Sequence, residues 1–355
     1  MPAWAYLLPA AGAALLGASL ALPLGAALAA LCALALIGAV IAAVHHAEVV
    51  AHRVGEPYGT LVLAVAITVI EVALIVSLML AGGADKATLP RDTIYSAVMI
   101  ICTGVVGLCL LAGGVSHHEQ TFRMEGTNSA LSALVALAGL SLVLPTFTTS
   151  SSAGTYTVSQ LAFVGISSLA LWAVFVFIQT VRHRDYFLPQ RNASDEEVHA
   201  APPTPLQAWA SFGLLLVSLV VVVGLAKQLS PIIEAGVAAV GAPKSVIGIA
   251  IAMLVLLPET WAAMRAALAD RLQTSMNLAL GSALASIGLT IPAVVVTATV
   301  LDLPLVLGLE SKDLVLLALT FLVSTITLGT GRTNVMQGAV HLVLFAAFLF
   351  LSLVP

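Results

Sequence analysis

The stretch HHAEVVAHRVGEPYGTLVLAVAITVIEVALIVSLM (45–79) places Glu71 near the middle of an apolar segment that is long enough to cross a bilayer. The segment VIGIAIAMLVLLPETWAAM (246–264) does the same with Glu259. An ionisable group at that depth costs about 2.5–3.5 kcal/mol on insertion scales, so such groups commonly mark an ion or proton pathway. The two glutamates are therefore candidates for groups that carry ions through a membrane.

The flanks of the two glutamates repeat one another. Each copy reads E-x6-G-x-P and then, after thirteen or fifteen residues, a further E. The two copies consist of Glu48, Gly55, Pro57 and Glu71, and of Glu234, Gly241, Pro243 and Glu259. A string this specific, found twice in a chain of 355 residues with 27 Gly and 16 Pro, indicates an internal repeat.

Bulk composition indicates an all-α polytopic membrane protein. Hydrophobic residues make up 60% of the chain, charged residues only 8%, and the mean hydropathy is +1.10. A soluble domain of this length needs more charge on its surface. The net charge of −4 is dispersed, so no nucleic-acid partner is expected. The three cysteines lie in apolar runs and have no metal-ligand spacing.

Windows of about 20 apolar residues predict eleven transmembrane helices. We place them near 3–20, 24–48, 58–82, 93–114, 127–146, 157–181, 206–241, 245–268, 273–300, 312–330 and 334–354. We expect the long segment 206–241 to be broken at Lys227, Ser230 and Pro231, and the start of the chain allows a hairpin instead of a full span. A hydrophilic linker at 182–205 carries an acidic patch of Asp195, Glu196 and Glu197.

The linker separates the two copies of the repeat. The first copy begins with the second span and the second copy begins with the seventh, five crossings later. An odd offset makes the copies enter the membrane from opposite sides, which is the inverted-topology repeat of secondary transporters. Eight of the thirteen basic loop residues lie on one side if the N-terminus is cytoplasmic, and this favours a cytoplasmic N-terminus and an outside C-terminus.

A carboxylate in mid-membrane can be neutralised by a proton or by a metal cation, and the two then compete for one group. We expect Glu71 and Glu259 to bind the transported cation and the proton, and hard cations such as Ca²⁺ take further oxygen ligands. Thr68 lies one helical turn before Glu71, and Thr103 and Ser282 lie on the neighbouring spans. Pro258 frees a backbone carbonyl one turn earlier in its helix.

A second group of residues lies near the predicted ends of spans, away from the midplane. We expect these residues to act in gating or pH sensing, because histidine titrates between pH 5 and 8 and because Glu234 is the repeat partner of Glu48. Ordinary interfacial residues that end a helix are the alternative. The group consists of His45, His46, Glu48, His52, His118, Glu119 and Glu234.

Competition of a cation and a proton for one carboxylate indicates antiport, the exchange of one ion for the other across the membrane. The residues leave two other functions open. A passive cation channel would need no proton coupling, but inverted repeats favour alternating access, and no run of carbonyls typical of a selectivity filter is visible. An intramembrane metal-dependent hydrolase would use the histidines, but neither an H-E-x-x-H spacing nor a nucleophile with a suitably spaced base is present.

At these residues the chain resembles the calcium/cation exchanger superfamily, in its cation–proton exchanger (CAX) branch, and is similar to bacterial ChaA-type sodium/calcium–proton antiporters. Three segments carry the resemblance: 45–79, LLAGGVSHHEQTFRMEG (110–126) and IGIAIAMLVLLPETWAAMRAALADRLQTSMNLALGSALASIGLTIP (247–292). The resemblance implies an extra first helix (1–22), two five-helix inverted repeats (23–181 and 206–355) and a joining cytoplasmic linker (182–205). It also implies the signature glutamates at Glu71 and Glu259.

The resemblance implies an antiporter rather than an enzyme, in the bacterial inner membrane and without a cofactor, whose partners are lipid, protons and inorganic cations. The superfamily usually places Asn three residues before each signature glutamate, whereas this chain has Thr68 and Leu256. The departure puts strict Ca²⁺ selectivity in doubt, and we expect exchange of Ca²⁺ and/or Na⁺ for H⁺, with K⁺ as a further candidate. The sequence leaves the oligomeric state open, a homo-oligomer included.

Overall fold

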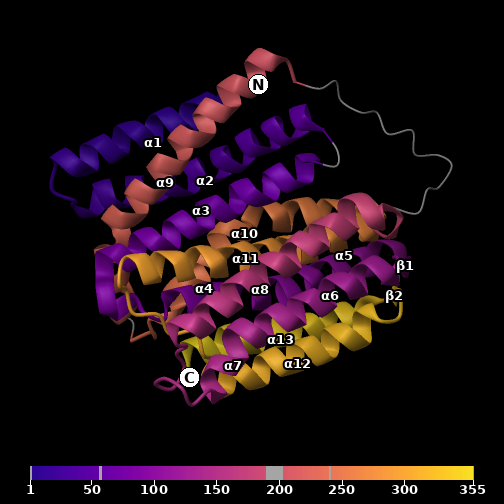
Figure 1. Cartoon of the computed structure of the whole chain (residues 1–355). Coiled ribbons are helices and arrows are strands. Elements are labelled where there is room, and N and C mark those ends of the chain that lie inside the picture. Colours follow the sequence, from indigo (N-terminus) through magenta and orange to yellow (C-terminus); the bar gives the residue numbers. More distant parts are fainter. Residues whose placement is uncertain (1, 56–57, 189–202, 240, 355) are drawn as a thin grey trace. The chain divides into compact units, whose positions relative to one another are not determined.

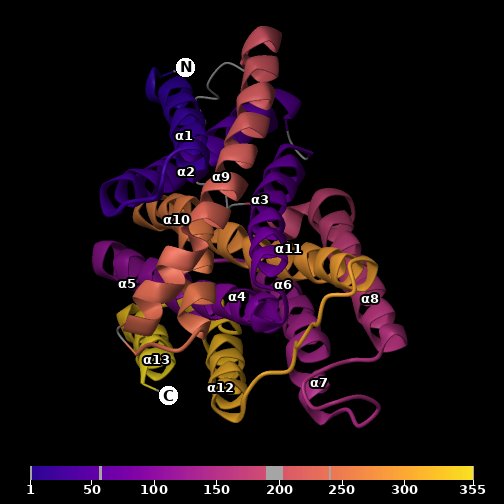
Figure 2. The same cartoon turned by 90° about the vertical axis from the view of Figure 1, so that its left-hand side faces the viewer.

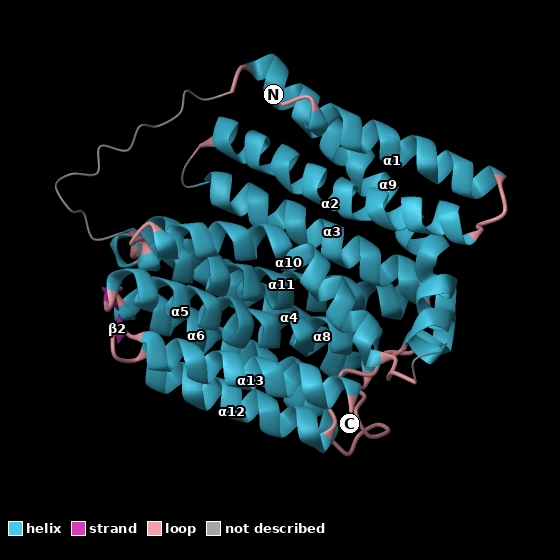
Figure 3. Ribbon diagram, turned by 180° about the vertical axis from the view of Figure 1, so that it is seen from behind, coloured by secondary structure: helices cyan, strands magenta, loops and turns pink. Residues whose placement is uncertain are grey.

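The apolar segments fold into long helices, and the loops are confined to the helix ends (Figure 3). The computed structural model describes residues 2–55, 58–188, 203–239 and 241–354. In these residues eleven helical segments are long and apolar enough to cross a membrane, as the sequence predicts. Helices satisfy all their backbone groups internally, which is the requirement that an apolar environment imposes.

The structure describes the following elements in chain order. The first half contains α1 (Trp4–Ala21), α2 (Ala26–Val54), α3 (Tyr58–Gly82), η1 (Gly83–Lys86), α4 (Leu89–Met99), η2 (Ile100–Val105), α5 (Val106–His117), β1 (Gln120–Thr121), α6 (Met124–Ala138), η3 (Gly139–Val143), α7 (Leu144–Phe147), α8 (Val158–Phe177) and η4 (Ile178–Arg182). After η5 (Arg184–Tyr186) come α9 (Pro205–Ala239), α10 (Ser245–Leu268), α11 (Leu272–Val300), α12 (Ser311–Leu328), β2 (Arg332–Thr333) and α13 (Val335–Leu353).

One sequence-based expectation about the spans needs correction, and the alternative given for the start of the chain is not observed. The segment that we expected to break at Lys227, Ser230 and Pro231 is one continuous helix, α9, of 35 residues. Prolines are tolerated inside membrane helices because neighbouring groups satisfy the freed carbonyl. At a rise of 1.5 Å per residue, α9 is roughly 52 Å long and exceeds the thickness of a bilayer. The start of the chain is a single helix, α1, and not a hairpin.

The helices group into two compact units that each take segments from both halves of the chain. The first unit comprises Met1–Lys86 and Glu197–Ile247, and the second comprises Ala87–Glu196 and Gly248–Pro355. These units follow packing, whereas the expected repeats follow sequence, so the repeat boundaries stay a prediction. The acidic patch at 195–197 lies outside the described residues.

In the first unit α2 packs against α1, α3 and α9 (Figure 1). Glycines allow α1 to approach its neighbours closely: a methyl group on Gly12 would meet Val221 of α9, and one on Gly224 would meet Leu16 of α1. Small residues at helix contacts are typical of membrane proteins, in which close packing takes the place of the hydrophobic effect between helices.

In the second unit the span formed by α4, η2 and α5 is the most buried of the candidate spans in the described residues. It contacts α11 and α13, while α6 and α8 pack on α11. The segment η2 is a π-helix, so the helix widens by one residue in its middle. The strands β1 and β2 form a short antiparallel pair that joins the turn after α5 to the turn after α12.

An extended segment, 303–310, connects α11 to α12 in the second unit, and Figure 2 shows its course between these helices. Its backbone amides donate hydrogen bonds to carbonyls of other elements: Val306 to Ala87 (3.0 Å), Gly308 to Gly154 (2.9 Å) and Leu309 to Leu142 (3.0 Å). Backbone amides of this non-helical segment thereby find their hydrogen-bond acceptors within the protein.

The two glycines of the sequence repeat both have a positive φ. Gly55 ends α2 with φ of 77° and ψ of 168°, and Gly241 follows α9 with φ of 68°. Side-chain-bearing residues rarely adopt such values, so these positions favour glycine. The repeat found in the sequence therefore places a glycine with a positive φ at the same position of both copies.

Replacing Gly55 or Gly241 with alanine should lower the melting temperature of the detergent-solubilised protein. A methyl group at either position meets no atom within 4 Å, so the cost is backbone strain alone, about 1–3 kcal/mol. The matched control is Gly236→Ala inside α9, where there is also open space and alanine is the better helix former by up to about 1 kcal/mol. Equal melting temperatures for the three variants would show that alanine at positions 55 and 241 causes no backbone strain.

Candidate functional site

Glu71 lies on α3 in the first unit with only 3% of its surface exposed. Thr68, one turn earlier on the same helical face, is 5% exposed, and its hydroxyl donates a hydrogen bond to the carbonyl of Ala64 (2.9 Å). Because the hydroxyl proton is committed to that carbonyl, the oxygen presents its lone pairs to any other group nearby. The face of α3 around these two residues therefore offers oxygen acceptors.

Glu259 lies half-buried on α10, in the part of that helix that belongs to the second unit. The helix continues through Pro258. Proline has no N–H, so the carbonyl one turn earlier, that of Leu254, loses its usual helical donor. A carboxylate and a backbone carbonyl on neighbouring turns form a second group of oxygen acceptors.

Thr103 and Ser282 also belong to the second unit. Thr103 is fully buried in η2, and its hydroxyl donates to the carbonyl of Met99, which again leaves the oxygen as an acceptor. Ser282 lies on α11 and is partly exposed. The predicted ligands thus fall into a set in the first unit, Glu71 and Thr68, and a set in the second; their joint binding of one cation stays a prediction.

Two of the predicted gating histidines pack inside the first unit. His46 is fully buried, with Nε2 2.8 Å from the carbonyl oxygen of Ala5 and Nδ1 3.2 Å from Oγ of Ser211. A carbonyl only accepts, so Nε2 carries the hydrogen, and the Ser211 hydroxyl donates to Nδ1 when the ring is neutral. The ring of His45 packs against that of Trp4, 4.8 Å away. Both histidines tie α1 to α2.

The two repeat-related glutamates have different surroundings. Glu48 is exposed on α2, as is His52 one turn later. Glu234 on α9 forms an ion pair with Lys86 of η1, with Nζ and Oε1 2.8 Å apart, and accepts a hydrogen bond from Ser230 (2.7 Å). The lysine side chain is 6% exposed and that of the glutamate 41%. The pair joins η1 to α9 within the first unit.

His118 and Glu119 lie at the surface in the turn that leads from α5 to β1. His118 has a positive φ of 65°, which histidine tolerates better than most residues. Glu119 forms an exposed ion pair with Arg332 of β2, with 3.6 Å between Oε1 and Nη1. Exposed pairs of this kind contribute little stability. Any role of these two residues in pH sensing stays a prediction.

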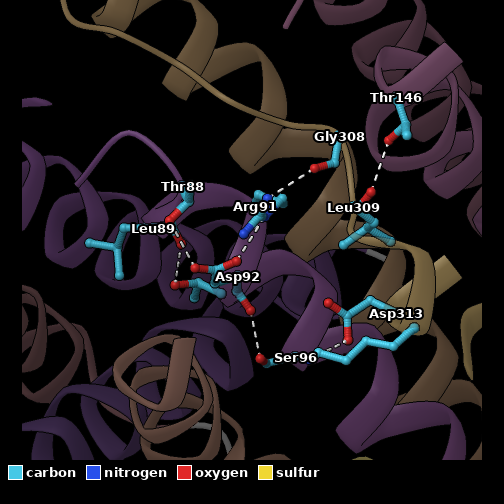
Figure 4. Close-up of polar contacts among 11 residues, drawn as sticks. Thr88, Leu89, Arg91, Asp92, Ser96, Thr146, Gly308, Leu309 and Asp313 are labelled. Atoms are coloured by element: carbon cyan, nitrogen blue, oxygen red, sulfur yellow. Dashed lines mark hydrogen bonds and ion pairs between the residues drawn. The ribbon is translucent and has the colours of Figure 1, made fainter. Parts of the chain in front are cut away.

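A buried ionic cluster holds the extended segment 303–310 to α4 (Figure 4). The Arg91 guanidinium donates to Asp92 Oδ1 (2.8 Å) and to the carbonyl of Gly308 (3.0 Å), and Thr88 donates to Asp92 Oδ2 (3.0 Å). Asp313 is paired with Lys312, with 3.4 Å between Oδ1 and Nζ. These aspartates serve as internal ion-pair partners and do not line a free surface.

The sequence analysis missed His341, which is fully buried on α13. Its Nδ1 lies 2.7 Å from the carbonyl oxygen of Cys102 in η2, and its Nε2 lies 3.2 Å from Oγ1 of Thr327. One signal was available: His341 is the one ionisable residue in the apolar segment 334–354, and intramembrane ionisable groups commonly have functional roles.

The Lys86–Glu234 pair should couple measurably in a double-mutant cycle. Glu234→Gln leaves a buried ammonium group without its anion and should lower the melting temperature, whereas Lys86→Met with Glu234→Gln should recover part of the loss. We expect a coupling energy of about 1 kcal/mol or more, because one partner is buried.

The exposed Glu119–Arg332 pair is the control for this cycle, and its coupling energy should stay below about 0.5 kcal/mol. Additive effects of the two substitutions at Lys86 and Glu234 would mean that the pair does not stabilise the first unit.

Comparison with known proteins places the chain among membrane exchangers. The family described as "Sodium/calcium exchanger protein" matches residues 24–181 and 210–354. The protein y4hA of Sinorhizobium fredii is 48% identical over 359 residues, which cover 100% of this chain and 97% of that protein. The sodium-potassium/proton antiporter ChaA of Escherichia coli is 36% identical over 336 residues, with 94% and 90% covered. The structure of native YfkE has the same fold, with a TM-score of 0.73 at 18% identity and coverage of 99% and 100%.

Proposed function

The chain belongs to the sodium/calcium exchanger protein family, and from this premise we propose that it exchanges cytoplasmic cations for protons by alternating access. In this proposal Glu71 and Glu259 are the carboxylates that cation and proton occupy in turn. The observation that carries it is the burial of Glu71, 3% exposed on an apolar helix, together with its repeat partner Glu259.

Burial makes the two ions mutually exclusive at such a carboxylate. A charged carboxylate in apolar surroundings is unfavourable unless a cation accompanies it, and a proton removes the charge. The carboxylate therefore holds either a cation or a proton, and release of one accompanies uptake of the other. Exchange follows from the charge balance of a single group without any further coupling device.

The surrounding oxygens favour a cation as the second ion. The hydroxyls of Thr68 and Thr103 donate their hydrogens to helix carbonyls, so each hydroxyl oxygen keeps its lone pairs to accept or to bind a cation. Pro258 leaves one further helix carbonyl without its usual donor. Oxygen acceptors of this kind are ligands for Na⁺, K⁺ and Ca²⁺. The antiporter ChaA, named for sodium and potassium, supports the inclusion of monovalent cations.

The family and the related structures are exchangers, so the chain is a membrane transporter and not an enzyme; this leaves the hydrolase without support. A passive channel is the remaining alternative, and it would conduct cations without moving protons. We place the protein in a bacterial inner membrane with a cytoplasmic N-terminus, on the excess of basic residues in the loops of that side.

Glu71→Gln and Glu259→Gln should each abolish cation-driven proton flux in everted or reconstituted vesicles. Glutamine keeps the shape of the side chain and removes the group that binds both ions. The measurement is the collapse of a preformed pH gradient on addition of Na⁺, K⁺ or Ca²⁺, normalised to the amount of inserted protein.

Glu125→Gln is the matched control, because Glu125 is exposed at the start of α6 and should leave the flux unchanged. Near wild-type flux in either the Glu71 or the Glu259 variant would remove that glutamate from the pathway. Cation flux without proton movement in the wild-type protein would establish the channel instead.

The apparent affinity for the cation should fall as the pH falls from 9 to 6.5. Protons compete for the same carboxylates, and for one competing proton the affinity changes by up to about tenfold per pH unit. The measurement is the half-saturating cation concentration at each pH. A constant value across this range would mean that proton and cation use separate sites.

A further inference from the structure

The two hydrogen-bond partners of His341 determine which ring nitrogen carries the hydrogen. The carbonyl of Cys102 can only accept, so Nδ1, 2.7 Å away, carries the hydrogen and donates it. In the neutral ring Nε2 then has only a lone pair, and the hydroxyl of Thr327 donates to it across 3.2 Å. His341 thus links α13, α12 and the π-helical segment η2 of the most buried span.

The Cys102 carbonyl belongs to a turn that an ordinary helix would not form. The π-helix η2 contains one residue more than the α-helical pattern allows, and its bonds run from i to i+5. Such turns are rare and are frequently found at functional sites; η3 and η4 are two further π-helical segments of this chain. A side chain that donates to a carbonyl of the turn stabilises the turn against its conversion to an α-helix.

Conversion to an α-helix would reorient Thr103, the residue after Cys102. One residue of an α-helix corresponds to a rotation of about 100°, so loss of the extra residue would turn one flank of the segment by that angle relative to the other. The hydroxyl of Thr103 would then point to a different neighbour. The direction of this oxygen depends on the turn remaining a π-helix.

The packing of α13 leaves His341 little freedom to move. A methyl group on Gly107 of α5 would lie 3.0 Å from Cβ of His341, and one on Gly338 of α13 would lie 2.4 Å from the backbone nitrogen of Leu111. The glycines therefore allow a close approach of α5 and α13. Thr320 of α12 makes a contact directly before the turn, since its hydroxyl lies 3.5 Å from the sulfur of Met99, the last residue of α4.

We propose that His341 is a positioning residue, which holds the π-turn through its Nδ1–H bond to Cys102 and so directs Thr103 as an oxygen ligand of the transported cation. This inference rests on the proposed function, in which Thr103 contributes to cation binding. His341 itself acts through the turn and does not contact the cation.

Four substitutions, three at His341 and one at Thr327, separate the two hydrogen bonds of the ring. In His341→Asn the amide nitrogen is two bonds from Cβ, as Nδ1 is, and retains the donor to Cys102. In His341→Gln the amide nitrogen is three bonds from Cβ, as Nε2 is, and only the contact with Thr327 can form. His341→Leu removes both contacts. Thr327→Val removes the Nε2 contact alone and leaves the ring in place.

The readout is cation-driven proton flux in vesicles, with KM for Na⁺ and Ca²⁺ measured separately from maximal flux. We expect the Asn and Val variants to keep KM within about threefold of wild type. The Gln and Leu variants should raise KM by about tenfold or more, with a smaller change in maximal flux per inserted protein. Equal KM values for the Asn and Gln variants would overturn the proposal.

A double variant tests whether His341 acts through Thr103. If it does, Thr103→Val combined with His341→Leu should raise KM no further than Thr103→Val alone, because the ligand is already lost. Multiplicative effects would overturn the proposal. Should the Leu variant fail to insert, the same cycle is run with His341→Gln. The proposed exchange is judged separately, by the Glu71 and Glu259 variants, and can hold while this inference fails.

Discussion

The absence of water around a membrane helix requires every polar group to find its partner within the protein, and the remaining features follow from this constraint. Helices satisfy the backbone, and buried hydroxyls such as Thr68 and Thr103 donate to carbonyls of their own helices. Ionisable groups pair with opposite charges, as Arg91 does with Asp92. Under the same constraint, a mid-membrane carboxylate that releases its cation has to take up a proton. The cost of an unpaired buried charge thus couples cation release to proton uptake.

The fold was largely predictable because it depends on local properties of the sequence. A segment of about 20 apolar residues forms a spanning helix whatever its neighbours are, so the expected spans agree with the structure. The error at Pro231 shows where local reasoning fails: a proline interrupts an isolated helix, but in a packed helix of 35 residues it does not. The turn glycines Gly55 and Gly241 were recognisable because no other residue adopts their conformation as easily.

The contacts of the candidate site were much less predictable. His46 meets Ser211 at a separation of 165 residues, and His341 meets Cys102 at 239. No spacing rule covers such distances, because they depend on how helices pack. The sequence identified Glu71 and Glu259 through their depth and their repeat, but it grouped His46 with exposed residues of the same helix and overlooked His341. Burial of each side chain, which separates these cases, is a property of the folded chain.

The two copies of the predicted repeat satisfy their polar groups differently. Thr103 lies in a π-turn, whereas α11, which carries the predicted ligand Ser282, is α-helical from Leu272 to Val300. Glu234 is bound to Lys86, whereas its counterpart Glu48 is exposed. An inverted repeat with identical halves would present the same ligands from either side of the membrane. In the predicted repeat, corresponding positions of the two copies are therefore stabilised by different contacts.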